Sequence, residues 1–245
     1  MKILSGDNEK IKVLKKLSQK KYRKLYKEFK VENLVMINDA IKAGFIPKRI
    51  FVTPKTEVKV EGLDKVEEVY EMNVLINRMF SDLETAPGVC AVFEIPENEV
   101  KGDKVVFLNG IGDPGNLGTI FRSGLAFGIT NFVLDNSCVD PYNYKTLQAS
   151  KNAVFNVNIV KGNLKTLEDL KKAKYQLVAA DHNGKVKIDK FEPAKKFCLV
   201  LGSESHGIES DYLDLCSKTV KIPIKKEIES LNVAIAAGIF FHHLS

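Results

Sequence analysis

The second half of this chain alternates short apolar runs with stretches in which apolar residues recur at helical spacing. Such alternation is typical of a parallel sheet covered by helices on both faces, because parallel neighbours need a crossover connection, usually a helix. We therefore expect an α/β fold there. The expected strands cover 104–108, 131–134, 155–160, 176–180, 197–201 and 219–222, and the expected helices cover 117–127, 144–151, 164–173 and 233–244.

A polar stretch, PENEVKGD, separates this half from the beginning of the chain. It runs from Pro96 to Asp103, lacks a large core pattern and contains the proline and glycine that mark linkers. We therefore predict two domains, a smaller one over 1–97 and a larger one over 98–245.

The smaller domain is predicted to mix helices and strands. It begins with a basic amphipathic helical region from Asn8 to about Glu28, whose apolar positions include Leu25 and Phe29. The remaining predicted elements are a helix ending at Gly44, a strand over 49–52, a turn-rich connection over 54–64, an element over 66–70, a helical or mixed piece to about Met79, and an element over 88–95.

The composition is that of a soluble globular protein. The chain has 245 residues, of which 44% are hydrophobic. No apolar run approaches the roughly 18 to 20 residues that a membrane span needs, and the first residues resemble neither a signal peptide nor a transit peptide. We expect a cytoplasmic protein with no membrane contact.

Positive charge is concentrated at the start of the chain. The formal net charge is +6, whereas residues 1–30 alone carry eleven Lys or Arg against three acidic residues. A concentrated basic segment suggests a polyanionic partner, RNA or DNA, held through its phosphates. The alternative, a solvated helix face without a partner, stays open at this point.

The four cysteines show no pattern of chemical use. None forms a CxxC pair or lies at metal-ligand spacing from a histidine. We expect buried thiols and no bound metal. The cysteines are Cys90, Cys138, Cys198 and Cys216.

A glycine-rich loop follows the first expected strand of the larger domain. Gly110, Gly112 and Gly115 have the GxGxxG spacing of dinucleotide-binding loops, and Asp135 ends the next expected strand. Pro114 argues against this interpretation, because it removes one of the backbone N–H groups that such loops offer to a pyrophosphate. The glycine spacing nevertheless makes a nicotinamide-dependent oxidoreductase one hypothesis for this chain.

The helix after this loop favours a different chemistry. Asn116 is a natural N-cap, and Arg122 lies about two turns further on, outside the apolar face. Its guanidinium can reach back toward the loop and bind a phosphodiester, which a nicotinamide site does not need. A surface ion pair is the alternative role for this arginine.

Two later loops carry polar groups that could join the same site. Glu204, in LGSESHG, could pair with Arg122 or accept a hydrogen bond from a substrate hydroxyl, and His206 is a weaker candidate base. Ser230 is a plausible N-cap of the last helix, with Asn232 near its start. That helix has a small-residue side and bulky phenylalanines, so we expect it to pack against the protein or a second subunit.

Together the three loops resemble the three motifs of the SpoU/TrmH family of RNA 2′-O-methyltransferases, within the SPOUT group. GDPGNLGTIFRSGLAFG is similar to the first motif, LVLGSESHG to the second and IPIKKEIESLNVAIAAG to the third. The resemblance implies S-adenosylmethionine as cofactor, a homodimer, and a trefoil knot near the second and third motifs. It also implies that the first domain binds RNA, for which we expect ribosomal rather than transfer RNA.

The resemblance carries residue roles with it. Gly202, Ile222 and Leu231 match positions that hold the cofactor mainly through backbone groups, and no metal is implied. Lys226 stands where glycine is usual, and Ala234 where serine is frequent. The positions that match the catalytic or structural polar set are Asn116, Arg122, Glu204, Ser230 and Asn232.

Overall fold

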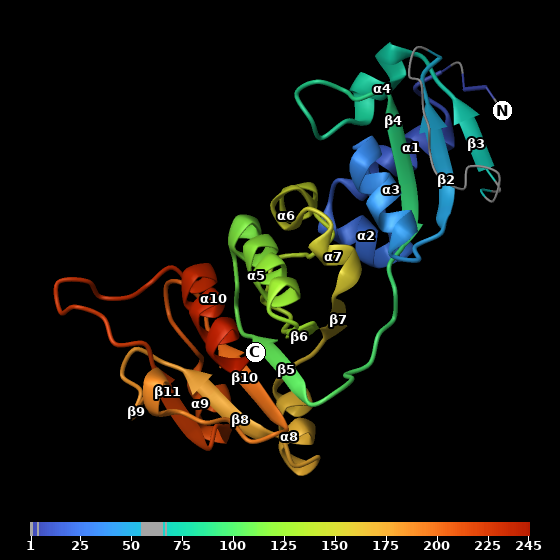
Figure 1. Ribbon diagram of the computed structural model, residues 1–245. Helices are drawn as coiled ribbons and strands as arrows, with labels where there is room; N and C mark the ends of the chain where they lie inside the picture. The colour runs from blue at the N-terminus through green and yellow to red at the C-terminus, as the bar shows by residue number, and fades with distance from the viewer. Residues whose placement is uncertain (1, 4, 55–65, 67) are drawn as a thin grey trace. The chain divides into compact units, whose positions relative to one another are not determined.

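The protein divides into two compact units in a computed structural model (Figure 1) that describes residues 2–3, 5–54, 66 and 68–245. The first unit comprises the described residues up to Pro96 together with Tyr142–Phe155, and the second comprises Glu97–Pro141 and Asn156–Ser245. The turn-rich connection predicted over 54–64 lies almost entirely outside the described residues. The sequence pattern does not reveal that 142–155 packs with the first unit.

The first unit is built around a mixed four-stranded sheet in the order β1-β4-β2-β3. β4 is antiparallel to both β1 and β2, whereas β2 and β3 are parallel. The elements are α1 (Glu9–Leu17), α2 (Lys20–Tyr26), β1 (Glu28–Val31), α3 (Leu34–Lys42), β2 (Pro47–Val52), β3 (Glu68–Glu71), α4 (Val74–Phe80), β4 (Val89–Glu94), α6 (Tyr144–Ser150) and α7 (Ala153–Asn156), of which α7 ends one residue beyond the unit.

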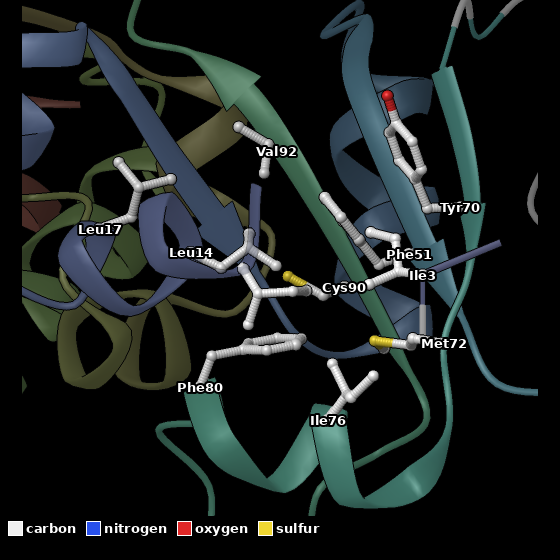
Figure 2. Close-up of a cluster of buried hydrophobic side chains, with 11 residues drawn as sticks. Ile3, Leu14, Leu17, Phe51, Tyr70, Met72, Ile76, Phe80, Cys90 and Val92 are labelled. Atoms are coloured by element: carbon white, nitrogen blue, oxygen red, sulfur yellow. The ribbon is translucent and has the colours of Figure 1, made fainter. Parts of the chain in front are cut away.

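A hydrophobic core joins α1 and α4 to the strands of this sheet. Figure 2 shows Leu14 and Leu17 of α1 pointing toward Cys90 and Val92 of β4, with Phe80 below them. These side chains are almost completely buried. Burying a leucine or phenylalanine stabilises a fold by roughly 1.5–3 kcal/mol, so this cluster fixes α1 onto the sheet.

The basic helical region predicted from Asn8 to about Glu28 is helical in both halves, but it ends before Glu28. It consists of two short helices, and α2 ends at Tyr26, before the C-cap Lys27, which adopts a left-handed conformation with φ of 53°. The chain then enters β1, so Phe29 is a buried strand residue, whereas Leu25 is 65% exposed. A left-handed residue stops a helix because it cannot continue the right-handed hydrogen-bond pattern.

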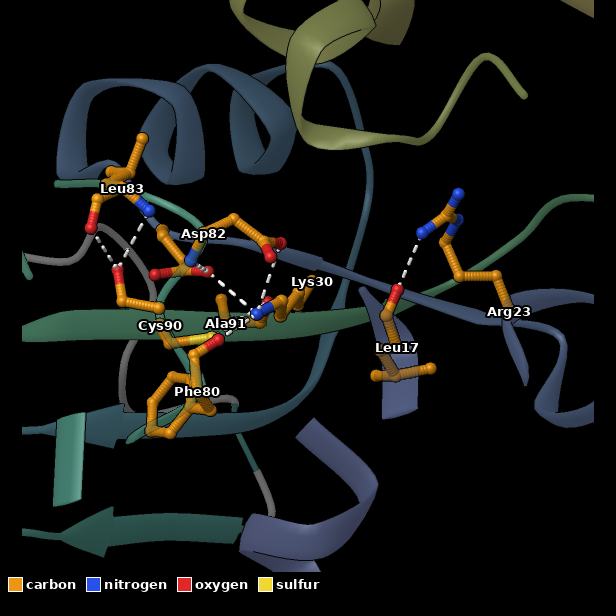
Figure 3. A network of polar contacts seen from close by, with 10 residues as sticks. Leu17, Arg23, Lys30, Phe80, Asp82, Leu83, Cys90 and Ala91 are labelled. Atoms are coloured by element: carbon orange, nitrogen blue, oxygen red, sulfur yellow. Dashed lines mark hydrogen bonds and ion pairs between the residues drawn. The ribbon is translucent and has the colours of Figure 1, made fainter. Parts of the chain in front are cut away.

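Three charged side chains form a buried group between β1 and the end of α4, which we call the lysine cluster: Lys30, Glu32 and Asp82. Lys30 Nζ lies 2.9 Å from Glu32 Oε1 and 3.3 Å from Asp82 Oδ2, and it also donates to the Phe80 carbonyl (Figure 3). Glu32 Oε2 has no hydrogen-bond partner among the described residues. This basic residue is therefore used inside the first unit and is not available to a partner.

The second unit contains a seven-stranded sheet in the order β7-β6-β5-β10-β8-β11-β9, with every pair of neighbours parallel. The predicted parallel α/β fold is thereby confirmed. Its elements are β5 (Lys104–Leu108), α5 (Pro114–Ala126), β6 (Asn131–Leu134), β7 (Asn158–Lys161), α8 (Leu164–Lys172), β8 (Gln176–Ala180), β9 (Val186–Lys187), η2 (Ile188–Lys190), β10 (Phe197–Leu201), α9 (Ser210–Leu215), β11 (Lys218–Lys221) and α10 (Val233–Leu244).

The strand predicted over 155–160 begins later than expected. Ala153–Asn156 forms α7, and β7 begins at Asn158. Phe155 belongs to the first unit, where its ring packs edge-on against Phe45 with centroids 5.5 Å apart. The apolar run therefore serves two different cores.

Helices α5 and α10 pack together in the second unit. A Cβ added to Gly238 of α10 would lie 3.7 Å from the Ser123 hydroxyl of α5, and Phe241 packs edge-on against Phe132 of β6. The small residue at 238 thus permits the close approach that the sequence predicted for the last helix. None of the helices in the described residues has the length and apolar character needed to cross a membrane.

Candidate active site

Three loops leave the sheet of the second unit at the carboxyl ends of parallel strands. One follows β5, one follows β10 and one follows β11, and each contains one of the motifs recognised in the sequence. Because parallel strands end at the same edge of the sheet, the three loops open on one side. This edge is where open α/β sheets bind ligands.

The first loop leads directly into α5, and its cap differs from the prediction. Asp113 is the N-cap, and its carboxylate accepts a hydrogen bond from the Asn116 backbone N–H at 2.7 Å. Pro114 occupies the first turn, where its missing N–H costs nothing. Asn116 is therefore not the cap, and its side chain is available for other contacts.

A chain of three polar side chains connects the three motif loops. Asn116 Nδ2 donates to Glu204 Oε1 at 2.7 Å, and Asn232 Nδ2 donates to Asn116 Oδ1 at 2.9 Å. Asn232 also caps α10, because its Oδ1 accepts from the backbone N–H groups of Ala234 and Ile235. Three of the five predicted catalytic residues are thus brought together, and we call them the amide chain.

Two predicted residues stand apart from the amide chain. Arg122 lies on the exposed side of α5 and forms no ion pair within the described part of the chain. Glu204 accepts from Asn116 instead of pairing with this arginine. Ser230 precedes α10 and does not cap it, since Asn232 has that role.

The second loop is a closed turn that holds Glu204 at an exposed position. Ser203 and Gly207 exchange two backbone hydrogen bonds of 2.9 and 3.0 Å, and the His206 N–H donates to the Ser203 hydroxyl. A Cβ on Gly202 would lie 2.1 Å from the backbone carbon of Gly207, so only glycine fits there. His206 contacts Ser205 at 2.7 Å and belongs to the turn.

The three predicted cofactor residues lie around these strand ends. Gly202 follows β10 directly, Ile222 follows β11 directly, and Leu231 comes just before the cap of α10. Ile222 and Leu231 are half-buried apolar residues, and Gly202 has no side chain to block its backbone. A glycine and two apolar residues at this edge suit a cofactor that carries an adenine ring and binds backbone groups.

Sequence reasoning missed a second group of polar side chains, which lies where the first two loops leave the sheet. It consists of Asn109, Asp135 and Glu209, and we call it the asparagine cluster. Asn109 is 1% exposed, and its Nδ2 donates to Asp135 Oδ2 at 2.6 Å and to Glu209 Oε1 at 3.1 Å. Its Oδ1 accepts from the Glu209 backbone N–H at 2.9 Å. The position of Asn109 directly after an apolar run was the only sequence signal.

The carboxylate of Asp135 accepts hydrogen bonds from groups of the protein itself. Its Oδ1 accepts from the backbone N–H groups of Gly110, Ser137 and Cys138 and from the Ser137 hydroxyl. Burial alone would raise the pKa of Asp135, but the hydrogen bonds from Ser137, Asn109 and Gly110 outweigh burial and leave this pKa below its ordinary value. The carboxylate is therefore not available to bind a ribose, as the nicotinamide hypothesis requires.

The thiols of this region are not reactive groups. Burial, followed by the nearby Asp135 carboxylate, raises the pKa of Cys138 to about 12. All four cysteines are thiols in the described structure, and three of them are buried. Among the described residues, no group of three His, Cys, Asp or Glu side chains is placed to bind a metal ion.

Comparison with known proteins identifies the family. The sequence model of the SpoU rRNA methylase family matches residues 103–242, and that of the MRM3-like substrate binding domain matches residues 8–91. The Bacillus subtilis 23S rRNA (guanosine(2553)-2'-O)-methyltransferase RlmP is 31% identical over 99% of this chain and 98% of its own length. The chain belongs to the SpoU rRNA methylase family.

Solved structures agree with this membership. The solved structure of a TrmH-family protein from Porphyromonas gingivalis superposes with a TM-score of 0.88 at 28% identity, covering 98% of both chains. An AdoMet-bound rRNA methyltransferase from Sinorhizobium meliloti also gives 0.88, at 26% identity over 99% of this chain and 96% of that one. The nicotinamide hypothesis gains no support from these relatives.

Proposed function

We propose that this SpoU-family protein transfers a methyl group from S-adenosylmethionine to a ribose 2′-hydroxyl in ribosomal RNA. The observation that carries the proposal is the full-length similarity to a 23S rRNA 2′-O-methyltransferase, together with the amide chain that joins all three motif loops at one edge of the sheet. Ribosomal RNA is favoured over transfer RNA because that relative is named for 23S rRNA.

When bound, S-adenosylmethionine supplies a methyl group activated by its positive sulfonium. The protein has to hold the ribose oxygen in line with that methyl at about 3–3.5 Å and assist loss of the hydroxyl proton. Gly202, Ile222 and Leu231 are proposed to hold the cofactor through backbone and apolar contacts. A transfer of this kind requires no metal.

Arg122 is proposed to bind the phosphate beside the target ribose and to stabilise negative charge developing on the 2′-oxygen. A guanidinium is always protonated in proteins, so it acts as a hydrogen-bond donor and not as a base. Its exposed position without an ion pair in the described part of the chain leaves its donors available for RNA. Asn116, Glu204 and Asn232 are proposed to fix the loops around Arg122. Ser230 is the fifth polar residue of the proposed site.

The first unit is proposed to bind RNA. We propose that residues 1–97 form the RNA-binding domain and that residues 98–245 form the methyltransferase domain. Lys20, Lys21 and Lys24 are exposed on α2, whereas Arg23 and Lys30 are buried, so only part of the basic segment is offered to phosphates. Tyr22 and Tyr26 stack on one another with centroids 6.2 Å apart. This arrangement supports a phosphate-binding surface in preference to base stacking.

A homodimer with an interface on α10 is a further part of the proposal. Ile235 and Ile239, one helical turn apart, are 57% and 38% exposed, and Ile224 and Ile228 of the preceding loop are 36% and 55% exposed. Large exposed apolar side chains grouped in one segment favour burial against a second subunit. A trefoil knot remains a prediction from the family resemblance, and a cytoplasmic location remains a prediction from the sequence.

Methyl incorporation tests the central proposal. Purified protein, tritiated S-adenosylmethionine and ribosomal RNA should yield 2′-O-methylated RNA, and Arg122→Ala should abolish incorporation while calorimetry shows unchanged cofactor affinity. Arg122→Lys is the control, because it keeps the charge but loses the planar fork. Tight binding of NAD with no binding of S-adenosylmethionine would overturn the proposal.

A further inference from the structure

The asparagine cluster connects the first two motif loops at one buried side chain. Asn109 comes directly after β5, and its backbone N–H donates to the Leu201 carbonyl at the end of β10. Its side chain uses both amide hydrogens and the amide oxygen in the three bonds described above. The orientation of the amide is fixed by its partners, because a reversed amide would point its oxygen at two carboxylates.

The two carboxylates fasten different parts of the site. Asp135 holds the first loop through the Gly110 N–H and the turn after β6 through Ser137 and Cys138. Glu209 ends the second loop, five residues after Glu204, and it begins α9 without capping it through its own side chain. Asn109 is therefore the link between a loop that starts α5 and a loop that carries Glu204.

We propose that Asn109 is a positioning residue for methyl transfer: by bridging Asp135 and Glu209, it fixes the loop that presents Glu204 against the loop that presents Asn116. This inference rests on the proposed function. The Asn116–Glu204 hydrogen bond lies on the solvent side of the same two loops, so a shift of residues 202–209 changes its length directly.

The charges of the cluster provide a test that a purely structural role would not pass. Asn109 is neutral and donates to two carboxylates, so aspartate at 109 would place a third carboxylate against them and remove both donors. Such a group binds a proton as the pH falls, and the shared proton replaces one lost donor. The other titratable groups facing the cluster are Cys138 and Tyr212, whose pKa values burial and the nearby carboxylates raise, so both stay neutral below pH 8.5.

The experiment compares Asn109→Asp with Asn109→Ala across pH 5.5 to 8.5. In Asn109→Asp, kcat for rRNA methylation should fall on the order of tenfold or more at pH 8, with a smaller change in KM. The ratio of its activity to wild type should recover as the pH falls. Asn109→Ala lacks both the donor and the charge, so its ratio should stay low and flat.

Rescue by exchange gives a second readout. Adding Asp135→Asn to Asn109→Asp reduces the three facing carboxylates to two and lets the amide now at 135 donate to the carboxylate at 109, while the carboxylates at 109 and 209 still face one another. Activity at pH 8 should rise above that of Asn109→Asp alone and stay below wild type. A flat activity ratio in Asn109→Asp, or an exchange variant no better than the single one, would overturn the proposal.

Hydrogen–deuterium exchange separates failure of this proposal from failure of the proposed function. Peptides spanning 201–210 should exchange faster in Asn109→Asp at pH 8 and regain protection at low pH after correction for the intrinsic exchange rate. Glu209→Ala, which leaves β5 and β6 untouched, should accelerate the same peptides. If wild type methylates no RNA, the proposed function fails, yet unchanged exchange in both variants would still refute the positioning role.

Discussion

The two units each contain a buried polar cluster, and the clusters are built in opposite ways. The lysine cluster places one ammonium between two carboxylates and leaves Glu32 Oε2 without a partner among the described residues. The asparagine cluster places one neutral amide between two carboxylates, and every polar atom of that amide is paired. The first depends on charge, whereas the second depends on geometry.

This difference indicates different purposes. A buried ion pair loses hydration energy that its attraction only partly returns, so it adds little net stability but is costly to break. An amide with both donors and its acceptor satisfied fixes the relative position of three backbone segments. The lysine cluster therefore closes the core of the first unit, and the asparagine cluster holds two of the motif loops in the second unit.

Removing the central cation should give the largest effect on stability. Lys30→Met leaves Glu32 and Asp82 facing one another in a site where side chains are at most 17% exposed. Breaking a buried pair in this way costs about 3–5 kcal/mol. Hydrogen exchange measured separately for peptides of each unit should show the loss in the first unit alone.

The matched control removes charge along with the cation. Lys30→Met combined with Glu32→Gln and Asp82→Asn should recover a large part of the lost stability, because no unpaired charge remains buried. If the single and triple variants are equally unstable, packing of the lysine stem and not charge accounts for the loss, and the contrast between the clusters disappears.

Truncating Asp135 should have a smaller but broader effect in the second unit. Asp135→Ala leaves the N–H groups of Gly110, Ser137 and Cys138 and one donor of Asn109 without their acceptor. An unsatisfied buried group costs about 1–3 kcal/mol, with water replacing the acceptor for the more exposed donors. Thermal unfolding, followed by hydrogen–deuterium exchange resolved by peptide, measures the loss of stability. Asp135→Asn keeps one accepting oxygen for the backbone N–H groups of Gly110, Ser137 and Cys138 but loses the acceptor for Asn109 Nδ2, so its loss should be intermediate. A loss equal to that of alanine would contradict the role assigned to the backbone hydrogen bonds.

The stability of the second unit at low pH should also depend on the Asp135 carboxylate. The pKa of Asp135 is lower in the folded protein than its unfolded value of about 3.9, so its contribution is fully present above that value and is lost as the pH falls through the folded pKa. The second unit should therefore lose stability below about pH 4. In Asp135→Asn this part of the acid dependence should be absent, and an unchanged acid profile would show that the carboxylate is not stabilised by folding.

The sequence was a good guide to elements and a poor one to polar contacts. Apolar runs located β5, β6, β8 and β10 to the residue, because buried strands in a parallel sheet have clear ends. Phe29 was misplaced because its apolar spacing continues the helical pattern past Lys27, where a left-handed conformation ends the helical region and the chain enters β1. Helix caps were misassigned because Asp113 and Asn116, like Ser230 and Asn232, are equally good caps by composition.

The asparagine cluster was beyond prediction for a physical reason. Asp135 and Glu209 are distant in sequence. Both reach Asn109 at the end of β5 only because β6 and β10 flank that strand. The spacing of Asp135 from the glycine loop imitated a ribose-binding acid, whereas its hydrogen bonds show an internal role. A motif places residues on loops, but the strand order decides which loops touch.

Exposed lysines provide the smallest effect on stability and complete the comparison with buried Lys30. Lys20→Gln, Lys21→Gln and Lys24→Gln together should change the stability of the first unit by at most about 0.5 kcal/mol per site, as is usual for surface positions. RNA affinity should fall, and the slope of log K against log salt should flatten by about 0.7–0.9 for each phosphate that the protein no longer neutralises. Filter binding over a salt series, with Lys165→Gln on α8 as a surface control, measures both. An unchanged slope would assign α2 to the solvated surface, and the role of the first unit in binding RNA would then have to be sought on another face.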